Sequence, residues 1–164
     1  MVESRMVSES LAAALNEQVG REFAASLRYT SIASYFAARE LHLLAKLFRE
    51  QADEERGHAL KLIEYLEQAG APVRIPAIPA PEHDFASAVE AVRAALQWEL
   101  EVTGQFNRLM EQASRENDYL AQEFLGWFVT EQLEEVAKMR RLYQVVSTAR
   151  NNLLMVEAYL VHGE

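Results

Sequence analysis

The 164-residue chain contains no cysteine, so disulfide bonds, cysteine-based zinc sites and thiolate catalysis are all excluded. Proline is confined to one place, because all four prolines lie between Pro72 and Pro81. No apolar run approaches the roughly 20 residues that a membrane-spanning helix needs. The first ten residues also lack the apolar stretch of a signal peptide. We therefore expect a cytoplasmic protein without a membrane partner.

Basic residues are few relative to acidic ones: 16 against 25, which gives a formal net charge of −9. Such a balance argues against a nucleic-acid partner and suits the attraction of cations. Half of the residues are apolar, so the chain is not expected to be disordered. Its length fits one domain, over residues 1–164, with a sizeable core.

Outside the proline window, apolar residues recur with the period of a helix. The pattern predicts four long helices at about residues 8–39, 42–69, 85–114 and 119–146, and a short fifth helix at about 152–161. Gly70 is placed to end the second helix in the left-handed conformation, and Asp84 or Ser87 to cap the third. The short connections predict two antiparallel hairpins, whereas the proline window is long enough to travel the length of the bundle. We expect an all-α four-helix bundle with one long crossover between the second and third helices and a short C-terminal helix.

Each long helix carries one carboxylate in the middle of its apolar face. The four are Glu22, Glu55, Glu99 and Glu135, and His58 shares the face of Glu55. Taken alone, one such glutamate is usually a slightly rotated, solvated residue, and one such histidine is usually hydrogen-bonded in the core. Four carboxylates at matching depth would repel one another unless a cation lay between them. Oxygen ligands with one imidazole suit iron or manganese, so the pattern predicts a buried metal centre.

With these residues in place, the chain resembles the bacterial-type non-haem ferritins over essentially its whole length. The resemblance is carried by LNEQ at 15–18 with Glu22, by Tyr29, by EERGH at 54–58, by Glu99, and by WFVTEQLEE at 127–135. It implies a ferritin-like bundle with a diiron carboxylate centre, for which this fold is known. By the same resemblance, Glu22 and His58 would bind the first iron and Glu55 would bridge both. Glu99 and Glu135 would bind the second iron, with Gln132 beside it, and Tyr29 would lie beside the diiron centre.

The resemblance also implies an additional iron site at Glu54, Glu131 and Glu134, for which an exposed acidic helix face is the competing interpretation. No haem is expected, because Arg56 stands where bacterioferritins have the methionine that ligates haem. The fourth helix supplies Gln132 where a symmetric site would have glutamate, and Glu135 where it would have histidine, so the second iron should be bound more weakly. A rubrerythrin is disfavoured by the lack of cysteine, and a mini-ferritin by a ligand set that one bundle completes.

The function implied by the resemblance is iron storage. A ferroxidase centre would oxidise Fe(II) with dioxygen or peroxide, and ferric mineral would collect inside a hollow shell of 24 subunits. Two alternatives stay open. One is a soluble diiron oxidase or peroxidase that stores nothing, and the other is a non-catalytic helical scaffold whose acids are structural.

Overall fold

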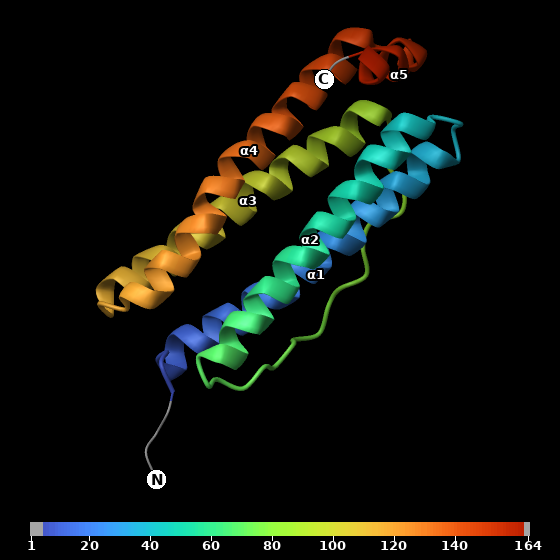
Figure 1. Ribbon diagram of the computed structural model, residues 1–164. Coiled ribbons are helices and arrows are strands. Elements are labelled where there is room, and N and C mark those ends of the chain that lie inside the picture. The colour runs from blue at the N-terminus through green and yellow to red at the C-terminus, as the bar shows by residue number, and fades with distance from the viewer. Residues whose placement is uncertain (1–4, 163–164) are drawn as a thin grey trace.

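The structure is a computed structural model that describes residues 5–162 (Figure 1). It contains α1 (Glu9–Ala37), α2 (His42–Gln68), α3 (Ala88–Arg115), α4 (Tyr119–Ala149) and the short α5 (Leu153–His162). Figure 1 shows α1 and α2 as one antiparallel hairpin and α3 and α4 as another. The two hairpins pack together through contacts between α1 and α3. The segment between α2 and α3 is extended, so α3 starts at the end of the bundle opposite to the end of α2. The predicted all-α bundle with its long crossover and fifth helix is confirmed.

Three of the long helices begin at a side-chain cap, as short polar side chains before a helical run predict. The acceptors are Ser8 for α1, Ser87 for α3 and Asp118 for α4, and each accepts a hydrogen bond from the backbone N–H three residues on. α3 begins at Ala88 rather than at residue 85, because Ser87 and not Asp84 is its N-cap. α4 continues to Ala149, beyond the predicted end at residue 146.

α1, α2 and α3 each end in the same type of backbone conformation. A residue in the left-handed region follows each helix: Glu40 (φ 59°), Gly70 (φ 73°) and Asn117 (φ 54°). The next backbone N–H then returns to a carbonyl in the last turn, at 3.1, 2.9 and 2.9 Å respectively. This is the Schellman closure of a helix C-terminus, and it confirms the predicted role of Gly70.

α2 is capped by another helix. Its N-cap, Leu41, has no side chain that could accept a hydrogen bond. Instead, the carboxylate of Glu157 in α5 accepts from the backbone N–H groups of Leu43 (2.8 Å) and Leu44 (2.9 Å). A negative charge at a helix N-terminus is favourable, so this contact fixes α5 against the bundle.

The crossover lies along α1. Asn16 donates to the carbonyl of Pro72 (3.0 Å) and accepts from the backbone N–H of Arg74 (2.6 Å). Gly20 allows the close approach of Pro76, since a Cβ built on this glycine would lie 2.3 Å from the proline ring. The Asn16 side chain therefore fixes the crossover through its backbone, and the lack of a side chain at Gly20 lets Pro76 pack closely against α1.

Two apolar clusters fill the bundle, one towards each end. Tyr29, Phe36 and Phe48 belong to the first, and Phe106 and Phe128 to the second. Polar side chains that are equally buried lie between the clusters. Within residues 5–162, no helix is both long enough and apolar enough to cross a membrane.

Candidate metal centre

The polar layer contains all five side chains that the apolar stripes predicted as ligands. Glu22, Glu55, Glu99 and Glu135 expose 3% or less of their surface, and His58 exposes 5%. Their ligand atoms form two groups, each with all atoms within 4.8 Å of one another: Glu22, Glu55 and His58, and Glu55, Glu99 and Glu135. Glu55 belongs to both groups, which is the geometry that a ligand bridging two ions requires.

In the first group, His58 links the two carboxylates. Its Nδ1 lies 3.2 Å from Glu55 Oε2 and 3.6 Å from Glu22 Oε2. Gln18, one turn before Glu22, donates to Glu22 Oε1 at 2.6 Å. Glu22 Oε2 is buried and has no hydrogen-bond partner. A buried carboxylate oxygen without a partner is costly, so this atom is available to a cation.

In the second group, Glu99 is held from two sides. The Tyr29 hydroxyl donates to Glu99 Oε1, and Gln132 Nε2 lies 3.2 Å from Glu99 Oε2. Gln132 also donates to the backbone carbonyl of Glu99, again at 3.2 Å. The structure thus places Gln132 beside the second group, as the resemblance implies, and Tyr29, which the resemblance places beside the diiron centre, contacts the same glutamate. Their participation in chemistry remains a prediction, as do the ligand roles.

Two residues that were not predicted contribute to the same group. Gln51, one turn before Glu55, donates to Glu135 Oε2 at 2.6 Å and to Glu55 Oε1 at 3.1 Å. Lys138, one turn after Glu135, donates to Gln51 Oε1 at 2.7 Å. The sequence signal for Gln51 is that a polar residue stands on the apolar face one turn from a predicted ligand. Gln18, one turn before Glu22, has the same relation to its ligand. For Lys138 the sequence contained no such signal, because its side chain reaches the centre from the edge of the bundle.

Burial dominates the titration of the carboxyls. It raises the pKa of Glu55 to about 7, although the neighbouring His58 opposes the shift. Burial and the charge of Glu55 raise the pKa of Glu99 to about 7, against the hydrogen bonds from Tyr29 and Gln132. Burial likewise raises the pKa of Glu135 to about 8. Metal-free protein therefore holds protons in the centre at neutral pH.

The pKa of His58 is raised, whereas burial on its own lowers the pKa of an imidazole. Burial alone would lower its pKa, but the carboxylates of Glu22 and Glu55 outweigh that effect and raise it to about 10. The pKa of Tyr29 is also well above its usual value, because the hydroxyl is buried and faces Glu99. An imidazolium thus acts as the internal counter-ion of the first group until a metal ion replaces its proton.

The donor set fits two hard or borderline divalent cations. It offers carboxylate oxygens and one imidazole nitrogen, which suit iron and manganese. Burial raises the pKa values of Glu55 and Glu99 most, and the charge of neighbouring carboxylates adds to the shift, so bound cations would stabilise their ionised forms. Among the described residues, Glu22 Oε2 has no hydrogen-bond partner and offers a ligand atom.

The predicted additional site lies on the surface. Glu54 and Glu134 are exposed and Glu131 is half-buried, and all three line one shallow depression beside Glu135. Among the described residues, the groups of side chains close enough to hold one ion do not include these three. Glu54 instead pairs with Lys138 at 3.3 Å. Metal binding there remains a prediction.

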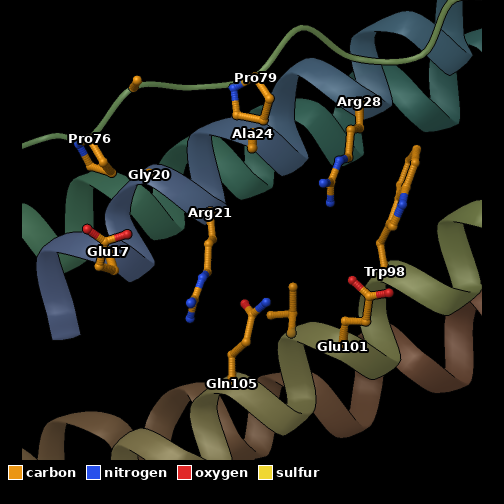
Figure 2. Close-up of a pocket in the computed structure, with 12 residues that line it drawn as sticks. Glu17, Gly20, Arg21, Ala24, Arg28, Pro76, Pro79, Trp98, Glu101 and Gln105 are labelled. Carbon is orange, nitrogen blue, oxygen red and sulfur yellow. The ribbon is translucent and has the colours of Figure 1, made fainter.

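A separate cavity of about 230 Å³ lies between α1, α3 and the crossover. In Figure 2, Arg21 and Arg28 point from α1 towards α3, which supplies Glu101 and Gln105. The predicted ligands do not line it. Gln18 links the cavity wall to the centre, because it donates to Gln105 (3.0 Å) as well as to Glu22. The predicted ligands thus lie in the polar layer, apart from this cavity.

Comparison with known proteins identifies the family. A family profile described as "Ferritin-like domain" matches residues 12–149. The chain belongs to the ferritin family. It is 38% identical over 160 residues to Ferritin BfrB of Mycolicibacterium smegmatis, covering 98% of this chain and 88% of that protein. It is 39% identical over 132 residues to a bacterial non-heme ferritin of Staphylococcus aureus, covering 80% of each.

Solved ferritin structures have the same fold. An open pore ferritin from the archaeon Archaeoglobus fulgidus superposes with a TM-score of 0.91 at 30% identity, covering 94% of this chain and 96% of that one. The resemblance to bacterial ferritins is thereby confirmed. Membership of the ferritin family supports a role in iron storage.

Proposed function

We propose that this ferritin oxidises Fe(II) at the buried layer and stores the product as ferric mineral. The observation that carries the proposal is the pair of overlapping ligand groups that share Glu55. Two Fe(II) ions are the substrates, with Glu22 and His58 on the first, Glu99 and Glu135 on the second, and Glu55 between them.

Two Fe(II) ions in one site supply the two electrons that the oxidant accepts. Each Fe(II) loses one electron, and the two electrons with two protons reduce dioxygen to hydrogen peroxide, or peroxide to water. The protein's contribution is to hold both ions at short range in a site from which bulk water is excluded. His58 and the protonated carboxyls must release protons when the ions bind, because ligands coordinate in their deprotonated form.

Storage requires a closed shell, which we propose to be an assembly of 24 subunits. One feature that supports assembly is the apolar surface of α5, where Leu154, Met155 and Val161 expose 73%, 61% and 61% of their areas. Patches of this kind are unusual on a monomer and mark contact surfaces. We propose that α5 lines pores in the shell. We also propose that no haem binds, because the exposed Arg56 next to Glu55 cannot serve as an axial ligand.

Stopped-flow oxidation of Fe(II) tests the ferroxidase centre. Glu55→Ala removes the shared ligand and His58→Ala removes the nitrogen donor, so both variants should lose the fast phase. Asp53→Ala, an exposed neighbour on the same helix, is the matched control and should oxidise Fe(II) at the wild-type rate. Wild-type rates in Glu55→Ala or His58→Ala would contradict the proposal. Native mass measurement separates a storage shell from a non-storing diiron oxidase or peroxidase, and the absence of stoichiometric oxidation would favour the scaffold.

A further inference from the structure

The side chain of Lys138 contacts both the polar layer and its surface margin. Its ammonium donates to Gln51 Oε1 (2.7 Å) and pairs with Glu54 Oε2 (3.3 Å). It comes from α4, whereas both partners belong to α2. Lys138 therefore connects the two hairpins beside the second ligand group.

Through Gln51, the ammonium acts on two of the ligands of that group. An amide that accepts through its oxygen presents its NH₂ group on the other side. The Nε2 of Gln51 thus points at Glu135 Oε2 (2.6 Å) and Glu55 Oε1 (3.1 Å). Those hydrogen bonds use oxygen lone pairs that a metal ion in the second position would need. The corresponding chain at the first group begins with a longer contact: Arg21 Nη1 donates to Gln18 Oε1 at 3.4 Å, and Gln18 donates to Glu22 Oε1 at 2.6 Å.

The charge of Lys138 acts in the same direction. A cation that already neutralises part of the carboxylate charge opposes the binding of a second cation nearby. Both effects weaken the second position and leave the first, on the far side of Glu55, largely untouched.

We infer that Lys138 is a positioning residue that keeps the Glu55, Glu99 and Glu135 position weaker, and more exchangeable, than the Glu22, Glu55 and His58 position. The inference rests on the proposed two-ion function and adds to it a specific cause for unequal binding. An ion that is held weakly in the second position leaves it easily, which a centre that passes its product on to a mineral requires.

Zinc(II) titration of metal-free protein by isothermal calorimetry tests the inference with a redox-inert probe. Wild type should bind two ions per subunit in two resolved steps. In Lys138→Met the second dissociation constant should fall by roughly tenfold, the order of effect expected when one positive charge near a divalent ion is removed from a half-exposed surface. The first step should stay within about twofold of wild type.

Two matched variants distinguish an effect of the placement of Lys138 from an effect of removing any positive charge nearby. Lys138→Arg keeps the charge and a donor, so its second step should stay close to wild type. Arg141→Met removes an equal charge from the same surface depression, where Arg141 is exposed, and should change the second step much less than Lys138→Met. An unchanged second step in Lys138→Met, or an equal shift in Arg141→Met, would overturn the inference.

A third zinc ion in Lys138→Met, with the second step unchanged, would also overturn it, because Lys138 would then only block the surface carboxylates around Glu54. Failure of the proposed function gives a different result, since wild type itself would then not bind two ions per subunit.

Discussion

Glu99→Gln tests whether the buried carboxyls trade stability for metal binding. Glu99 has a usual pKa of 4.5 and a folded-state pKa of about 7. Because the folded-state value is raised, the folded protein holds more protons than the unfolded chain between about pH 4.5 and pH 7. The free energy of unfolding of metal-free protein therefore falls as the pH rises through that window. Glutamine keeps the shape of the neutral carboxyl and does not titrate.

The two pKa values differ by about 2.5, which corresponds to a cost of about 3 kcal/mol for the ionised form in wild type at pH 8. Glutamine does not ionise, so the variant lacks this cost. It loses the hydrogen bond from Gln132 to Glu99 Oε2, which contributes about 1 kcal/mol. Metal-free Glu99→Gln should thus be about 2 kcal/mol more stable than wild type at pH 8. At pH 5, where wild-type Glu99 is protonated in the folded state, the mutant should be equal or slightly less stable.

Guanidinium unfolding in the presence of a chelator, at matched protein concentration, measures both values. Glu101→Gln on the same helix is the control, because Glu101 is exposed and its change should show no such dependence on pH. A Glu99→Gln variant that is less stable by the same amount at pH 5 and pH 8 would refute the reasoning. Glu99 would then be a structural acid, and the scaffold alternative would gain support.

Three further outcomes are expected from the geometry. Glu157→Gln should lower the thermal midpoint, with a loss of about 1 kcal/mol, because one acceptor and the charge at the start of α2 disappear; an unchanged midpoint would mean that this cap contributes nothing. Gly20→Ala should destabilise by about 1–3 kcal/mol through its clash with Pro76, whereas Gly57→Ala, with open space around it, should be neutral or stabilising by up to about 1 kcal/mol. At pH 6.5, zinc binding should release at least one proton per subunit, since His58 has a pKa of about 10 and must lose its proton to coordinate; calorimetry in buffers of different ionisation enthalpy measures this, and zero release would contradict it.

The order of the helices and the depth of the acids were predictable because both follow from periodicity. Four apolar stripes that each carry a carboxylate at matching depth indicate a shared interior position, so the sequence predicts one layer of Glu22, Glu55, Glu99 and Glu135. The start of α3 was less certain, since Asp84 and Ser87 are both good caps and the choice between them depends on where the crossover ends.

The contacts that cross between helices could not be read from the sequence. The reach of Lys138 to Gln51 depends on the rotation of α4 against α2 and on the direction of a long side chain. The cap that Glu157 provides to α2 depends on where α5 docks, since more than a hundred residues separate donor and acceptor. Periodicity specifies which face of a helix is buried, whereas these contacts are set by how the helices pack.

Anomalous diffraction at the iron absorption edge, from crystals loaded with Fe(II) without oxygen, tests the central claim most directly. The account predicts two iron peaks in the polar layer, one on each side of the Glu55 carboxylate. The first should lie against Glu22 and His58 and the second, at lower occupancy, against Glu99 and Glu135. Peaks confined to the protein surface, or a single buried peak that does not contact Glu55, would contradict the account.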